Sequence, residues 1–109
     1  MDNILEFYPF RAMQHEMNNG LVTVLFINPN PTFIEKIFFK KQIKKPYKIE
    51  LDEFGSFIWN LCDGKSNLKK IAEKLEDEFG DKVSPVENRV TEFINQMSKN
   101  KLINLFEKK

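Results

Sequence analysis

The sequence predicts an α+β fold in which a small antiparallel β-sheet of about three strands is followed by a bundle of three helices. β-branched and alternating apolar segments are confined to the first half of the chain, whereas apolar residues recur at helical spacing in the second half. The 109 residues include eleven Phe, whose large rings are sufficient for one core of this size. We therefore expect a single domain over residues 1–109, with a β-rich half at 1–51 and a three-helix half at 52–105.

Three segments of the first half are predicted strands. Residues 13–17 are the weakest, and the Asn18-Asn19-Gly20 that follows is typical of a hairpin turn, because Asn and Gly adopt positive φ at little cost. Residues 21–27 are the strongest, since they are rich in apolar and β-branched side chains. Residues 47–51 alternate between polar and apolar, which predicts a half-buried strand with its polar side chains toward solvent.

The connection between the last two predicted strands is basic. Residues 33–45 place apolar side chains at helical spacing and predict a short helix that ends before Pro46, with a strand at 38–43 as the alternative. The stretch 36–48 lacks acidic residues and carries Lys36, Lys40, Lys41, Lys44, Lys45 and Lys48. Such a cluster would attract an acidic partner or a phosphate backbone, or would serve as a solvated surface that protects a sheet edge.

Periodicity and stop signals define two consecutive helices after residue 51. The first follows Asp52, a predicted N-cap, and ends at Asp63-Gly64, whereas the second follows Ser66 or Asn67 and ends at Gly80. Their apolar faces comprise Phe54, Phe57, Ile58, Leu61 and Cys62 in the first helix, and Leu68, Ile71, Ala72, Leu75 and Phe79 in the second.

The third helix has the strongest start signal in the chain. Ser84-Pro85-Val86-Glu87 predicts a capping box with proline at the first helical position. Asn100 is the predicted end of this helix, and residues 102–105 predict a final short strand. The apolar stripe of the helix comprises Val90, Phe93, Ile94 and Met97.

Residue types suited to catalysis or metal binding are sparse. His15 and Cys62 are single, so the paired spacings of zinc sites are absent, as are Gly-x-Ser-x-Gly and glycine-rich phosphate loops. Cys62 lies on an apolar helix face, where a free thiol packs as a small hydrophobe, and Trp59 is also interpreted as a packing residue. We therefore expect no enzymatic activity, no bound metal and no cofactor.

The sequence also limits the compartment of the protein and the classes of partner. The sequence lacks a secretory signal and an apolar run long enough to cross a bilayer, which predicts a cytoplasmic protein without a membrane partner. A sheet with three helices has the outline of a winged helix, whose third helix would read nucleic acid. Glu87 and Glu92 there offset Arg89 and Lys99, so nucleic acid is an unlikely partner.

A series of short motifs extends from residue 51 to residue 103. It comprises Leu51, Asp52-Glu53, Phe57-Ile58-Trp59, Leu61-Cys62-Asp63-Gly64, Ile71-Ala72 with Leu75, and Leu102-Ile103. Together these motifs resemble the PqqD-like family, which acts as RiPP recognition elements (RiPP denotes a ribosomally made, post-translationally modified peptide) and whose founding member assists pyrroloquinoline quinone (PQQ) biosynthesis. The resemblance implies a winged-helix-like, non-enzymatic module that binds a precursor (leader) peptide by strand addition. It also implies a peptide-modifying enzyme as partner, either of the radical S-adenosylmethionine (radical SAM) class or of another class.

The resemblance further implies which residues would contact the peptide. The peptide strand would pair with Tyr47, Lys48, Ile49, Glu50 and Leu51, in a groove walled by Arg89, Val90, Phe93, Ile94 and Met97 of the third helix. Helical periodicity makes about half of that wall core residues.

Two features leave alternatives open. Residues 33–45 are longer and more basic than the corresponding link of the founding protein, so the peptide need not be the PQQ precursor, and the lysines would favour an acidic leader. A homodimer in which the same strand edge pairs with its twin is the structural alternative, and a winged-helix nucleic-acid binder is the other.

Overall fold

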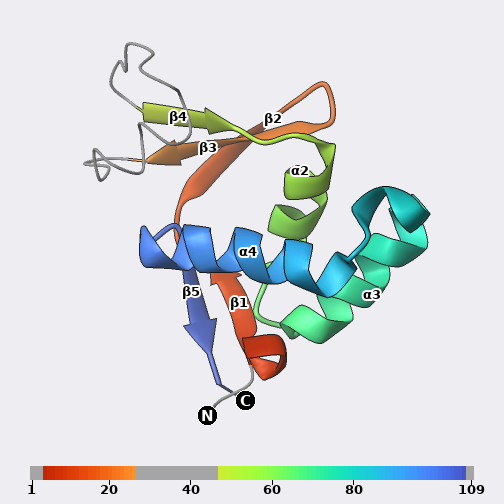
Figure 1. Ribbon diagram of the computed structural model, residues 1–109. Coiled ribbons are helices and arrows are strands. Elements are labelled where there is room, and N and C mark those ends of the chain that lie inside the picture. Colours follow the sequence, from red (N-terminus) through yellow and green to blue (C-terminus); the bar gives the residue numbers. More distant parts are fainter. Residues whose placement is uncertain (1–3, 27–46, 108–109) are drawn as a thin grey trace.

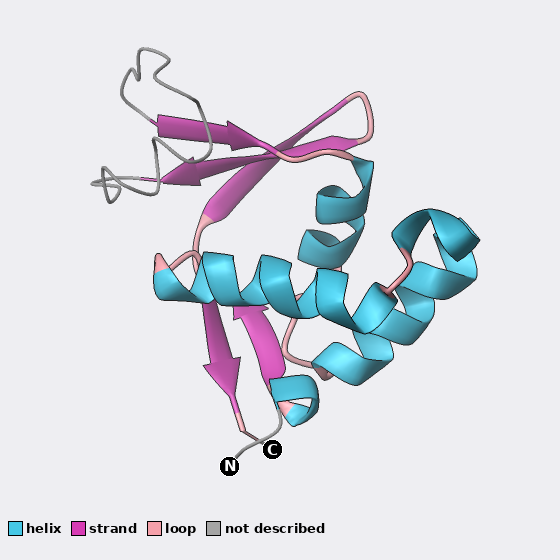
Figure 2. Ribbon diagram, viewed as in Figure 1, coloured by secondary structure: helices cyan, strands magenta, loops and turns pink. Residues whose placement is uncertain are grey.

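The computed structural model describes residues 4–26 and 47–107 and confirms the α+β architecture, with antiparallel strands and three helices (Figure 1). The strands form a three-stranded sheet and a two-stranded sheet. In Figure 2 the larger sheet lies at the top, the smaller one at the lower left, and a long helix passes between them in this view. The element order is η1 (Ile4–Glu6), β1 (Tyr8–Arg11), β2 (Gln14–Asn18), β3 (Leu21–Phe26), β4 (Tyr47–Glu50), α2 (Glu53–Asn60), α3 (Leu68–Phe79), η2 (Gly80–Val83), α4 (Val86–Lys99) and β5 (Ile103–Phe106).

The three-stranded sheet contains the predicted hairpin. Asn19 and Gly20 adopt positive φ angles of 55° and 81°, as a two-residue turn between antiparallel strands requires. β3 also pairs antiparallel with β4, where Val24 lies opposite Ile49, so the strand order is β2-β3-β4. The three predicted strands are confirmed, whereas the helix or strand predicted within residues 33–45 lies outside the described residues.

The predicted caps of the first two helices are confirmed. The Asp52 side chain accepts a hydrogen bond from the Gly55 N–H, and the Asn67 side chain accepts one from the Lys70 N–H, each at 2.8 Å. α2 ends at Asn60, earlier than predicted. The N–H groups of Leu61 and Cys62 bond to carbonyls three residues back, as in a 3-10 turn, and not four back as in an α-helix.

The capping box predicted for the third helix is wrong. The helix begins at Val86, and no described side chain caps it. Ser84 instead closes η2, since its N–H donates to the Asp81 carbonyl at 3.2 Å. Pro85, joined to Ser84 by a cis peptide bond, is therefore the N-cap residue and not the first helical one.

β1 and β5 form a second, two-stranded sheet. β5 confirms the strand predicted at residues 102–105, displaced by one residue, whereas β1 was not predicted. β1 has only four residues and includes Pro9, whose carbonyl accepts the Gly64 N–H at 2.9 Å. The Arg11 guanidinium donates to the Trp59 and Asn60 carbonyls at 3.0 and 3.1 Å, so β1 also caps the C-terminal end of α2.

One core joins the three-stranded sheet, the helices and β5. Trp59 and Cys62 have no exposed surface, which confirms the packing interpretation of both. Every helix among the described residues is too short or too polar to cross a bilayer. The core side chains from these elements include Val22, Val24, Ile49, Ile58, Trp59, Leu68, Ile71, Ala72, Leu75, Val90, Ile94, Met97 and Ile103.

Candidate functional site

β4 is an open edge of the sheet within the described part of the chain. The Leu51 N–H donates to the Val22 carbonyl at 2.8 Å, and because hydrogen-bonding direction alternates along a strand, the main chain of Ile49 also faces β3. The N–H and C=O groups of Lys48 and Glu50 therefore point away from β3. No described residue bonds to them, so this edge can accept another strand.

The five residues predicted as the peptide-pairing strand have different surroundings. Lys48 and Glu50 are exposed on the outer face of the sheet, whereas Ile49 and Leu51 are 1% and 7% exposed on the inner side. Tyr47 begins the strand, opposite Phe26 of β3. Lys48 and Glu50 thus present both main chain and side chain, and the other three hold them in the ladder.

The five residues predicted on the third helix divide sharply by exposure. Val90 and Ile94 have no exposed surface, and Met97 is 2% exposed, so these three form core. Phe93 is half-buried and Arg89 is exposed. Only Phe93 and Arg89 of this set therefore offer surface to a ligand in this conformation.

Phe93 lies where α4 meets the start of α2 and the end of β4. A Cβ atom on Gly55 would lie 3.2 Å from Cε1 of Phe93 and 3.4 Å from Cβ of Leu51, so a side chain there would require these neighbours to shift by a few tenths of an ångström. One helical turn earlier, Cζ of Arg89 lies 5.5 Å from the centroid of the Phe54 ring. The stripe of α4 that contains Arg89 and Phe93 therefore faces α2 and the end of β4.

Gln96 is a candidate site residue that sequence reasoning missed. It follows Arg89 by seven positions and Phe93 by three, so it lies on the same stripe of α4, and it is exposed. A search for apolar residues at helical spacing finds the buried stripe of a helix, but it misses a neighbouring stripe that mixes polar and apolar residues. The signal that could have found Gln96 is its spacing from Arg89 and Phe93.

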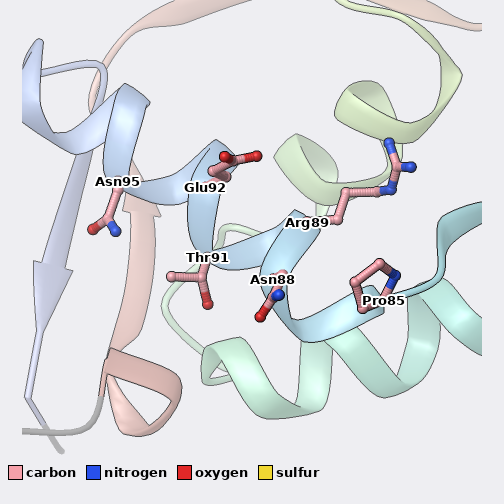
Figure 3. A pocket seen from close by; sticks show the side chains of 6 residues that line it. All are labelled: Pro85, Asn88, Arg89, Thr91, Glu92 and Asn95. Carbon is pink, nitrogen blue, oxygen red and sulfur yellow. The ribbon is translucent and has the colours of Figure 1, made fainter.

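The solvent-facing side of α4 carries only a surface hollow. Figure 3 shows Arg89 extending toward α2, whereas Asn88, Thr91 and Asn95 point away from it. With Pro85 and Glu92 these residues line about 540 Å³. Every described lining residue comes from α4 or directly precedes it, so within the described residues the hollow follows the polar face of one helix.

Two features bear on the chemistry of the described residues, metal-binding clusters and the thiol of Cys62. No group of three His, Cys, Asp or Glu side chains among them could hold a metal ion. Burial raises the pKa of the Cys62 thiol to about 12, although nearby Arg11 opposes the shift, so the thiol is protonated and unreactive at neutral pH.

One comparison with known proteins found a match. A family model described as coenzyme PQQ synthesis protein D (PqqD) matches residues 45–103, which is more than half of the chain. The match contains β4, α2, α3 and α4, so it includes both the open edge and the helix stripe described above. Comparisons with curated proteins and with solved structures found no match. On the extent of the family match, the chain belongs to the PqqD family.

Proposed function

We propose that this chain is a non-enzymatic peptide-binding module. It binds a precursor (leader) peptide by strand addition at the open edge of β4 and presents it to a modifying enzyme of the radical SAM class. Membership of the PqqD family supports a place beside a biosynthetic enzyme in PQQ synthesis or a related pathway. The observation that carries the proposal is the pair of free main-chain positions at Lys48 and Glu50, whose N–H and C=O groups an added strand would satisfy.

The stripe of α4 that contains Arg89 and Phe93 also supports the proposal, because it offers a surface for the side chains of an added strand. Side chains of an added strand alternate between the two faces of the sheet, so every second one would point inward. Those inward side chains would meet the Phe93 ring and the exposed stems of Arg89 and Gln96. The predicted wall residues Val90, Ile94 and Met97 would support this surface from behind.

Proline substitutions at the two open edges test strand addition. Lys48→Pro removes an N–H that points away from β3 and leaves the β3–β4 ladder intact, as an edge strand permits. Met17→Pro is the matched control on β2. Because Asn18 and Leu21 close a two-residue turn, the Met17 N–H also points away from β3.

The measurement is affinity capture from a lysate of the native host, with mass spectrometry of every retained peptide and protein. Wild-type protein and Met17→Pro are expected to retain the same short ribosomal peptide and a radical enzyme. Lys48→Pro is expected to lose at least about tenfold of the peptide, because one hydrogen bond is missing and the proline ring obstructs the edge. Circular dichroism would confirm that both variants are folded.

The outcomes separate the candidate edges. Equal capture by Lys48→Pro would overturn addition at β4, and loss confined to Met17→Pro would assign the peptide to β2. Retention of nucleic acid alone, or of the protein alone, by the wild type would contradict peptide binding altogether.

A further inference from the structure

The free positions of β4 carry opposite charges in a fixed order. Lys48 precedes Glu50 by two residues, and both side chains are exposed on the outer face of the sheet. Among the described residues neither side chain forms an ion pair. Ile49 between them is buried on the inner side, so the edge reads basic, apolar, acidic along the chain.

Hydrogen-bonding direction makes these same residues the ones that a ligand strand would pair with. Lys48 and Glu50 point their N–H and C=O groups outward, so each would form a hydrogen-bonded pair with one residue of an added strand. The side chains of such opposed residues lie on one face, close enough for opposite charges to stabilise and like charges to destabilise the pairing.

The Glu50 end of the edge has additional acceptors for a positive charge. Glu16, Thr23 and Glu50 lie in one row across the three strands, because Thr23 is opposite Glu16 on one side and Glu50 on the other. Glu50 and Asp52 also line a surface hollow of about 400 Å³, together with Thr23 and Asn18. A long basic side chain opposite Glu50 would therefore find a second carboxylate and polar oxygens within the same hollow.

From this arrangement we infer that the peptide bound at β4 carries a basic–apolar–acidic triplet, read from its own N-terminus, and lies antiparallel to β4. The inference rests on the proposed function and specifies its ligand. In antiparallel pairing the basic residue lies opposite Glu50, the apolar residue opposite Ile49, and the acidic residue opposite Lys48. A parallel strand would need the reverse order, so the two charges also select the direction of binding.

Selection from a random library of displayed peptides of roughly twelve residues tests the triplet without knowledge of the natural ligand. Wild-type protein is expected to enrich Lys or Arg, an apolar residue, then Asp or Glu. The double variant Lys48→Glu with Glu50→Lys keeps the net charge and is expected to enrich the reverse order. A synthetic peptide carrying the enriched triplet should lose on the order of tenfold in affinity when its two charges are exchanged.

A charge exchange elsewhere supplies the control. Lys70→Glu with Glu73→Lys lies on exposed positions of α3 and should leave the selected pattern unchanged. Wild-type protein that selects peptides lost in Lys48→Pro but lacking the triplet would overturn the charge rule and leave strand addition standing. Failure to select any peptide would overturn both, and an unchanged pattern in the double variant would overturn the triplet alone.

Discussion

The two open edges of the three-stranded sheet, β2 and β4, differ in how deeply their inner side chains are buried. Behind β4, the inner side chain of Ile49 is 1% exposed and belongs to the core. Behind β2, Met17 points to the same inner face and is 51% exposed. His15 is the remaining inner side chain of β2, and it lies edge-to-face with the Trp59 ring at 6.0 Å between centroids.

This difference indicates that an open edge does not by itself make a binding site. Under the proposed function, a strand added to β4 would lay its inward side chains against the Arg89 and Phe93 stripe, whereas the inner side chain of Met17 on β2 is largely exposed. Burial of apolar surface contributes about 25 cal/mol per Å², so the two edges would offer unequal affinity for identical main-chain pairing. The buried inner side chain of Ile49, and not the free N–H groups alone, distinguishes β4.

The largest expected effect is on the free energy of unfolding, and it comes from the buried inner side chain of β4. Ile49→Ala should lower the free energy of unfolding by about 2–5 kcal/mol, because it removes buried atoms and leaves a cavity. Met17→Ala should change it by no more than about 0.5 kcal/mol, as is usual for exposed positions. Urea unfolding followed by circular dichroism compares the two, and similar losses would remove the contrast between the edges.

An intermediate effect is expected from the contact that joins β3 and β4 to α2. The Ser56 hydroxyl accepts the buried Val22 N–H at 2.8 Å and lies 3.4 Å from the Leu51 carbonyl, to which it donates. Ser56→Ala would leave that N–H unsatisfied and should cost about 1–3 kcal/mol in unfolding free energy.

The matched change at the other edge is Asn18→Ala, which removes a hydrogen bond of 3.4 Å from the Asn18 side chain to Thr23. Its cost should be about 0.5–1.5 kcal/mol or less, because that bond is only partly buried. The same urea experiment compares the two variants. If Asn18→Ala lowers the free energy of unfolding more than Ser56→Ala does, β2 contributes more to stability through its hydrogen bond than the contact at Ser56 does.

The smallest expected effect is on the pH dependence of stability, and it comes from the buried thiol of Cys62 after α2. The pKa of Cys62 is raised from 9.0 to about 12 by burial, so its contribution to stability is intact below the unfolded value and is lost as pH rises toward the folded one. At a pH of about 10 the wild type should have lost about 1.4 kcal/mol more than Cys62→Ala, relative to neutral pH. Parallel pH profiles of the two proteins would mean that the thiol is not shielded in the native state.

Some elements followed directly from local chemistry. The helix caps Asp52 and Asn67 were predictable because a side chain accepts an N–H three residues away, within the same segment. The Asn19-Gly20 turn was predictable for the same reason, since positive φ is a property of the residues themselves. Local signals failed at Ser84, where a neighbouring 3-10 turn occupies the residue that would have capped α4.

The candidate site could be predicted only in part. Alternation within β4 predicted the outward Lys48 and Glu50, and their exposure confirms it. Periodicity in α4 identified its buried stripe, but Gln96 carries no apolar signal and was missed. β1 was missed too, because Pro9 weakens a four-residue strand whose pairing partner is almost a whole chain length away, in β5.

The sequence by itself determined the number and type of most elements, the turn at Asn19-Gly20 and the core face of each helix, because these depend on interactions within a few residues. Only the tertiary structure decided that the inner side chain of β4 is buried and that of Met17 on β2 is exposed, that Phe93 lies beside Gly55, and that Arg11 caps α2. These contacts join residues that are distant along the chain, so they depend on how the helices pack on the sheet. No local propensity encodes that arrangement.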